Sequence, residues 1–144
     1  MKKKVINNKR KNTLHKEFIK ILLKTPVKEV KFSKNRISLT FFGHRISDNI
    51  KIKSEEYVAE WSRRRKEIFI DKEITSSDKK KSFKALCVHE LIEKFLVEKF
   101  GLNLDEEAHL VATKKEKEYL ESINGNWRSH ESITYWDWHK HGEK

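Results

Sequence analysis

A short segment near the middle of the chain brings together three side chains that can bind or activate a metal ion: His89, Glu90 and Glu93. If the segment is a helix, all three lie in a sector otherwise filled by apolar residues such as Leu86 and Leu96. An imidazole and two carboxylates are costly to bury unless a partner satisfies them, and a metal ion does so. The segment therefore predicts a metal site on the buried side of a helix.

The spacing assigns different roles to these side chains. His89 and Glu93 are four residues apart, so on a helix they project from one face and can hold the same ion. Glu90 is rotated by about 100° from His89. It is placed to reach a water molecule on that ion, which is the position of a general base. The pattern is that of the H-E-x-x-H zinc helix with Glu93 in place of the second histidine. The alternative for Glu90 is an ion pair with Lys94.

A third ligand has to come from another part of the chain, and His109 is the best candidate. It follows Gly101, a natural helix stop, by eight residues, at the start of a second helix that a tight turn would bring back antiparallel. Glu116 lies on the same side of that helix and could hydrogen-bond a ligand histidine or coordinate the ion itself. A His–Glu–His set with a water molecule is a normal zinc site, and Mn²⁺ or Fe²⁺ can use the same donors.

The elements that must position these side chains follow from periodicity and from breaking residues. Helical spacing of apolar residues begins at residue 12 or 13 and ends before Pro26. Alternation and β-branched residues predict strands, whereas residues 57–61 fit a strand or a helix. The predicted strands span residues 27–32, 36–42, 44–53 and 67–71, and the later helices span residues 82–100 and 103–123. The aromatic tail, residues 127–144, is expected to pack back on the domain. The sequence thus predicts an α+β fold with a small, mostly antiparallel sheet.

Three stretches of this sequence together resemble a known group of proteins. IFIDKEI, CVHELIEKFL and GLNLDEEAHLVATKKE look like the zincin-type metallopeptidase core of small phage, bacterial and archaeal proteins. The sequence is similar in particular to phage-type proteins with H-E-x-x-E followed by A-H-x-x-A and a downstream Glu. The resemblance covers roughly residues 67–121.

The resemblance implies a minimal zincin-like fold and a site in which each residue has a role. His89, Glu93 and His109 would be the metal ligands and Glu90 the catalytic base, with Glu116 orienting a ligand or serving as an alternative one. The strand at residues 67–71 would lie near the substrate cleft, because zincins bind an extended peptide along a sheet edge. The leading hypothesis is accordingly a zinc-dependent hydrolase of peptidase type, acting on a peptide or protein.

Length and composition limit the possible domain organisation and the possible cellular location of the protein. With 144 residues, four glycines and one proline, the chain fits a basic flexible arm at residues 1–11 followed by one domain, residues 12–144. A single cysteine, Cys87, excludes an internal disulfide framework and favours the reducing cytoplasm. There is no run of eighteen apolar residues, so no membrane-spanning segment is expected.

The charge distribution supports a second hypothesis. The chain has a net charge of +11, and residues 1–81 hold 24 Lys and Arg but only 10 Asp and Glu. Arg63, Arg64, Arg65 and Lys66 form a basic run, which fits either a solvated turn or a set of phosphate contacts. The alternative function is therefore a basic nucleic-acid-binding or accessory protein, in which the metal site is structural or inactive.

Overall fold

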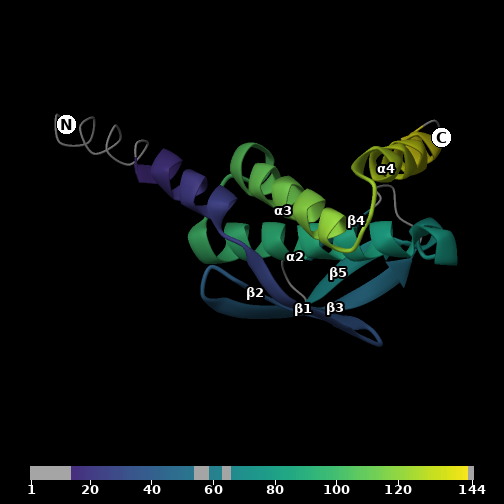
Figure 1. Cartoon of the computed structure of the whole chain (residues 1–144), viewed down its shortest axis with the longest axis horizontal. Helices are drawn as coiled ribbons and strands as arrows, with labels where there is room; N and C mark the ends of the chain where they lie inside the picture. Colours follow the sequence, from purple (N-terminus) through teal and green to yellow (C-terminus); the bar gives the residue numbers. More distant parts are fainter. Residues whose placement is uncertain (1–13, 54–58, 63–65, 143–144) are drawn as a thin grey trace.

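The computed structural model describes residues 14–53, 59–62 and 66–142, with side chains as far as residue 135. It confirms the α+β fold class (Figure 1). A helix at residues 14–24 precedes the sheet, and α2, α3 and α4 follow it. The strands are β1 (Val27–Ser33), β2 (Arg36–Phe41), β3 (His44–Lys53), β4 (Ala59–Trp61) and β5 (Glu67–Asp71). The helices after the sheet are α2 (Lys80–Phe100), α3 (His109–Ser122) and α4 (Trp127–Gly142).

The five strands form one sheet in the order β1-β2-β3-β5-β4. The pairs β1–β2, β2–β3 and β4–β5 are antiparallel, and β3–β5 alone is parallel, so the prediction of a mostly antiparallel sheet is confirmed. Of residues 57–61, which fitted either structure, Ala59–Trp61 form the strand β4, and residues 57 and 58 lie outside the described residues. Because β5 inserts between β3 and β4, the short strand β4 forms one edge of the sheet.

The two faces of the sheet differ in polarity because side chains alternate along each strand. Ile37, Leu39, Ile68 and Ile70 are fully buried on the inner face, where the helices pack. Figure 1 shows the described helices on that side of the sheet, with α2 lying across it and α3 beyond α2. The outer face carries no helix among the described residues, and polar side chains cover most of β1 to β3 there.

Helix α2 is the centre of the fold because it is buried between the sheet and α3. Gly101 ends it in the left-handed conformation, with φ of 64°, a geometry that glycine adopts at little cost. Lys94 on this helix is buried, although lysine is a residue type that is rarely buried without a partner. Its side chain is 10% exposed, and Nζ lies 2.6 Å from Oδ2 of Asp48, a residue on the inner face of β3. The ion pair with the Asp48 carboxylate therefore explains why the Lys94 ammonium can be buried.

The connection between α2 and α3 is short and closely fixed. The Asn103 side chain accepts a hydrogen bond from the Glu106 backbone N–H at 2.9 Å, and Glu107 Oε1 accepts one from the Asn103 N–H at 2.7 Å. These two reciprocal hydrogen bonds cap the start of the following helix, with Asn103 as the N-cap residue and Glu107 as the reciprocal acceptor. One π-helical turn, Leu104–Ala108, then leads into α3, so His109 becomes the first residue of that helix.

The ends of the described chain lie on the helical side of the molecule. The N-terminal helix packs through Phe18 against Phe42 and Phe100, and α4 folds back so that His130 is 2% exposed. The predicted basic arm at residues 1–11 lies outside the described residues. No described helix combines the length and apolar character needed to cross a membrane.

Candidate metal centre

Two helices bring three potential ligands together. His89 and Glu93 lie on successive turns of α2, and His109 is at the N-terminal end of α3. Glu93 Oε2 lies 2.9 Å from His89 Nε2 and 2.9 Å from His109 Nδ1. One donor atom from each of the three residues lies within 4.8 Å of the other two. The structure thus places the three sequence-predicted ligands around one point.

This cluster fits a zinc ion in both chemistry and size. Two imidazoles and a carboxylate are a common catalytic zinc donor set, and this set, drawn from the described residues, leaves a fourth position for water or substrate. Tetrahedral ligands about 2.0–2.1 Å from zinc have donor atoms roughly 3.3 Å apart. The two distances of 2.9 Å would therefore have to widen by a small amount on binding, and the third, between the two histidines, is within 4.8 Å and would have to take the same value.

Glu116 holds His89 from the side opposite the cluster. Its Oε1 lies 2.7 Å from His89 Nδ1, so the histidine can donate N–H there and direct the Nε2 lone pair toward the cluster. Burial tends to raise the pKa of the Glu116 carboxyl, but hydrogen bonds from His130 and His89 outweigh it and lower the pKa to about 2. Of the two roles that the sequence left open for Glu116, the geometry fits the orienting one, because histidines contact both of its oxygens.

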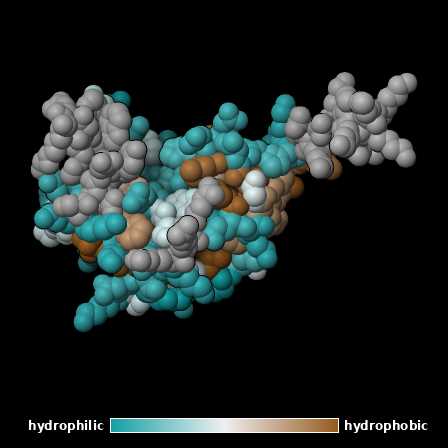
Figure 2. Space-filling view, turned by 180° about the vertical axis from the view of Figure 1, so that it is seen from behind, coloured by the Kyte–Doolittle hydropathy of each residue, from teal (hydrophilic) through white to brown (hydrophobic). Residues whose placement is uncertain are grey.

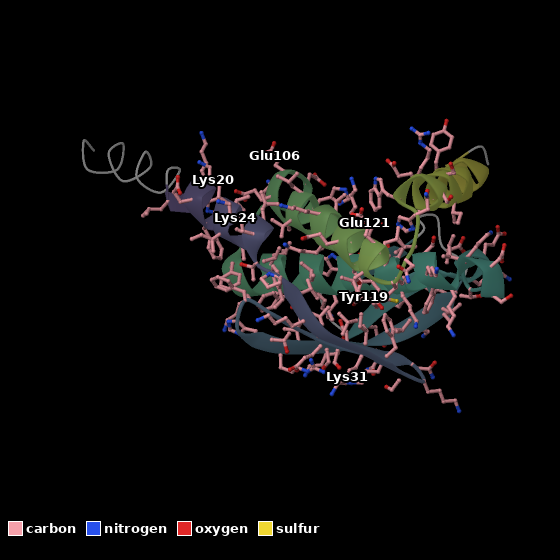
Figure 3. All side chains as sticks on the ribbon, viewed as in Figure 1. Lys20, Lys24, Lys31, Glu106, Tyr119 and Glu121 are labelled. Carbon is pink, nitrogen blue, oxygen red and sulfur yellow. The ribbon has the colours of Figure 1, made fainter. Side chains whose placement is uncertain are left out.

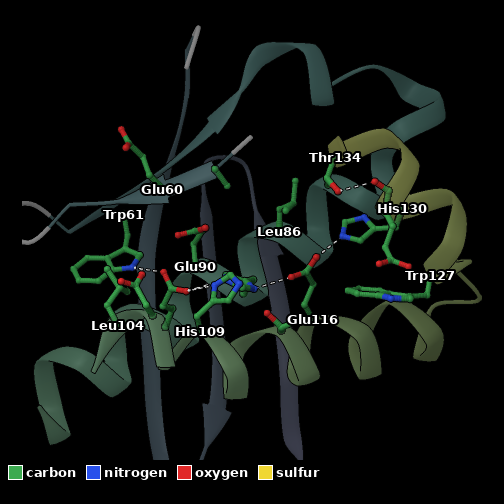
Figure 4. Close-up of a pocket in the computed structure, with 16 residues that line it drawn as sticks. Glu60, Trp61, Leu86, Glu90, Leu104, His109, Glu116, Trp127, His130 and Thr134 are labelled. Carbon is green, nitrogen blue, oxygen red and sulfur yellow. Dashed lines mark hydrogen bonds and ion pairs between the residues drawn. The ribbon is translucent and has the colours of Figure 1, made fainter. Parts of the chain in front are cut away.

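His130 extends this chain of contacts. Its Nε2 hydrogen-bonds Glu116 Oε2, and the side chain is 2% exposed (Figure 4). The row His130–Glu116–His89 thus links α4 to the proposed ligands through α3. On the other flank, Trp61 Nε1 of β4 donates a hydrogen bond to Glu93 Oε1 at 3.0 Å, which leaves Oε2 toward the histidines.

Sequence reasoning did not assign Trp61 or His130 to the site. His130 carried one usable signal, since it is a histidine in an aromatic segment that was expected to pack on the domain. Trp61 carried none, because its contact with Glu93 depends on the edge position of β4, and strand order is not a local property of the sequence.

Glu90 lines the same cavity as the cluster. The cavity has a volume of about 660 Å³ and is bounded by β4, α2, α3 and α4 (Figure 4). Glu90 Oε2 is buried and has no hydrogen-bond partner among the described residues. Burial raises the pKa of Glu90 to about 8, opposed by the charge of His89 and reinforced by Glu93 and Glu116. Because the Glu90 side chain lines this cavity, its carboxyl lies close to the space that a water molecule or substrate would occupy. Lys94, the alternative partner, has its ammonium at Asp48.

The strand that borders the cavity is β4, and not the strand that the resemblance suggested. The strand at residues 67–71 was expected beside the substrate cleft, but β5 is hydrogen-bonded on both sides, to β3 and β4. Ala59, Glu60 and Trp61 of β4 line the cavity instead. The correction follows from strand order, since β4 pairs with the far side of β5 and so takes the edge position next to α2.

The basic run was the other candidate site. Arg63, Arg64 and Arg65 lie outside the described residues, so the structure leaves their proposed role untested. Lys66 is exposed just before β5, and its backbone carbonyl accepts a hydrogen bond from Asn49 N–H at 2.9 Å.

Metal binding is expected to weaken as the pH falls. Burial lowers the pKa of His89, but the hydrogen bonds that its ring donates to Glu116 and Glu93 outweigh burial and raise the pKa well above its usual value. A metal at Nε2 must displace a proton, so zinc affinity should fall by about tenfold per pH unit for each displaced proton below that pKa. Competition with a chelating dye of known protonation constants, repeated across the neutral range, measures this slope. A pH-independent affinity would contradict the ligand role of His89.

Replacing His130 tests the row of contacts behind His89. His130→Leu is expected to weaken zinc binding by about 10–100-fold, the usual cost of removing a partner that orients a ligand. His130→Gln can still donate to Glu116 and should recover most of that affinity. Ser132→Ala, a change at an exposed position of the same helix, is the control. Thermal unfolding of each metal-free variant separates lost stability from lost affinity. Equal zinc affinities for the Leu and Gln variants would exclude the orienting role.

Comparison of the chain with known protein families, with curated proteins and with solved structures gives no match. The function therefore has to be argued from the residues and their geometry.

Proposed function

We propose that the protein is a metal-dependent hydrolase of peptidase type, with zinc as its ion. The observation that carries the proposal is the position of Glu90 beside the three-residue cluster. The Glu90 side chain lines the cavity that His89, Glu93 and His109 also line, and its buried Oε2 has no hydrogen-bond partner among the described residues. A structural metal site needs ligands but no such carboxylate, whereas a hydrolytic site needs both.

Each residue then has a defined task. His89, Glu93 and His109 hold the ion, which when bound would polarise a peptide carbonyl and lower the pKa of a water molecule. Glu90 accepts a proton from the attacking water and delivers it to the leaving amine. Glu116 and Trp61 fix the two α2 ligands, at 2.7 Å and 3.0 Å, so that neither side chain has to reorganise during the reaction.

A peptide is the substrate class that the cleft supports best. Strand β4 lines the cavity and forms an edge of the described sheet, so its outward backbone groups can pair with an extended chain. Trp61 and Leu104 add apolar surface on the same side of the cavity (Figure 4). These features support a peptide or a protein segment as the substrate.

The choice of zinc and of compartment rests on chemistry. Two imidazoles with one carboxylate suit zinc, although Mn²⁺ and Fe²⁺ accept the same donors. The free thiol of Cys87 is buried, and burial raises its pKa well above the usual value, with the charge of Glu90 adding to the shift. A lone unreactive cysteine is consistent with the proposed cytoplasmic location.

Removal of the metal tests the proposed function. The full chain should cleave members of a fluorogenic peptide library, and dialysis against a chelator should reduce cleavage to background. Adding back Zn²⁺, Mn²⁺ or Fe²⁺ separately identifies the active ion, with Zn²⁺ expected to restore the most activity. Cleavage that persists after the metal has been removed would contradict the proposal, and so would a metal-loaded protein that cleaves no peptide in the library.

A further inference from the structure

The segment that forms most of the sheet carries a net positive charge. Residues 27–53, which form β1, β2 and β3, include seven Lys and Arg but two Asp and Glu. Residues 80–122, which form α2 and α3, include eight Lys and Arg and nine Asp and Glu. One of the two acids in the sheet segment, Asp48, faces inward and is paired with Lys94. The sheet surface is therefore strongly positive, whereas the helical surface is nearly neutral.

The cations lie together on the outer face of the sheet. We call this surface the basic face and define it by Lys28, Lys31, Arg36, Arg45 and Lys51, all of which are exposed. Strand pairing places them on one side. The cross-strand neighbours of the first four are serine, threonine or asparagine residues of that face, and the neighbour of Lys51 is Phe69 of β5, which lies on the same face. The lowest part of the molecule in Figure 2, where the sheet lies, is correspondingly hydrophilic, and Figure 3 shows Lys31 at that side.

The two arginines of the basic face are held in place by neighbouring side chains. Arg36 donates to Ser47 Oγ at 2.6 Å and to Asn49 Oδ1 at 3.3 Å. Arg45 donates to Ser38 Oγ at 2.8 Å and, with its other terminal nitrogen, to the backbone oxygen of Glu29 at 2.8 Å. Guanidinium groups fixed across the strands lose less conformational entropy on binding an anion, and each has further N–H donors to offer.

Acidic residues limit the extent of this surface without neutralising it. Glu29 carries the one carboxylate close to Arg45 among the described residues, and its Oε2 lies 3.6 Å from the guanidinium in an exposed pair of little energy. Glu67 and Asp71 lie on the outer side of β5, next to β3, and mark the boundary of the basic face. The positive surface therefore covers β1, β2 and most of β3.

We propose that the basic face binds double-stranded nucleic acid through its phosphates, independently of the metal centre. No two of these cations stand directly opposite each other on adjacent strands. Polar residues separate them, so the backbone positions of neighbouring cations are roughly 7–10 Å apart. These spacings suit the phosphate groups of a duplex backbone. Serine, threonine and asparagine side chains between the cations are the neutral donors that commonly contact phosphate.

The composition of the surface favours a duplex over other polyanions. The outer positions of β1, β2 and β3 carry no apolar side chain that could insert into a lipid surface. They carry no aromatic ring either, and Phe69 of β5, opposite Lys51 on the same face, is only 9% exposed. Single-strand binding without sequence preference depends on accessible rings that stack on bases. The basic face would therefore recognise a duplex through its charge and its sugar–phosphate backbone. Such binding does not depend on base sequence and weakens as the salt concentration rises.

The test measures binding of a fluorescently labelled mixed-sequence DNA duplex to the full chain at several salt concentrations. Four phosphate contacts would reduce the affinity by about 100-fold between about 50 and 200 mM salt. The triple variant Lys28→Gln, Lys31→Gln, Lys51→Gln should lower the slope of log affinity against log salt by roughly three. The triple variant Lys24→Gln, Lys99→Gln, Lys114→Gln loses the same charge from exposed helical positions and should bind like the wild type.

Other outcomes would overturn the proposal. No binding at low salt, or an equal loss in both triple variants, would show that the basic face is not a specific surface. Stronger binding to anionic phospholipid vesicles or to single strands than to the duplex would assign a different partner. Glu90→Gln should bind the duplex normally, which keeps this test separate from the test of hydrolysis.

Discussion

Replacing Glu90 with glutamine should reduce kcat/KM for peptide cleavage by about 10²–10⁴-fold, the usual contribution of a positioned general base. The amide has nearly the same shape as the carboxyl but cannot accept the proton of the attacking water. Metal content should stay at the wild-type value, because the donor cluster consists of His89, Glu93 and His109. Activity and metal content are measured on the same preparation.

The control for this change is Glu98→Gln, which makes the same substitution on α2 at a side chain that is 45% exposed. It should retain wild-type activity. Two results would contradict the role of Glu90. The first is a Glu90→Gln protein with nearly full activity, which would place the base elsewhere. The second is a variant that loses its metal, which would make Glu90 a ligand.

Replacing His109 with alanine should abolish stable metal binding. It removes one of three ligands, and the loss of affinity should exceed the roughly 100-fold upper limit for removing an orienting partner. The side chain of His109 is 59% exposed, so the substitution should leave the fold intact. The metal content of the purified variant, measured by elemental analysis, is expected to be close to zero, and peptide cleavage should fall with it.

A matched control is His15→Ala, which removes another partly exposed histidine, one that pairs with Glu107 away from the cluster. That variant should keep its metal. If His109→Ala also retains about one ion per chain with wild-type affinity, the ligand set proposed above is wrong, and Glu116 becomes the next candidate for a direct ligand.

Local sequence signals were sufficient for the elements that carry the ligands. Helix α2 was predictable because its apolar residues recur with helical spacing and Gly101 ends it. The approach of His109 to Glu93 was predictable because a short connection after Gly101 makes α3 run back antiparallel to α2. The helix α2 and the turn that follows it both depend on residues that are close together in the sequence.

The rest of the site depends on contacts between distant parts of the chain. Lys94 has the sequence signature of a surface lysine, and only the pairing of β3 with the sheet places Asp48 beneath it. Trp61 reaches Glu93 because β4 is added outside β5, and His130 reaches Glu116 because α4 turns back over the cleft. These arrangements follow from the packing of whole elements, which no local pattern specifies.

The most direct test of the proposed metal centre is anomalous X-ray diffraction at the zinc absorption edge from crystals of the protein grown with zinc. The account predicts one strong peak between His89 Nε2, Glu93 Oε2 and His109 Nδ1, about 2.0–2.2 Å from each atom. A peak held by other residues, or a zinc-treated crystal with no peak at this position, would contradict it.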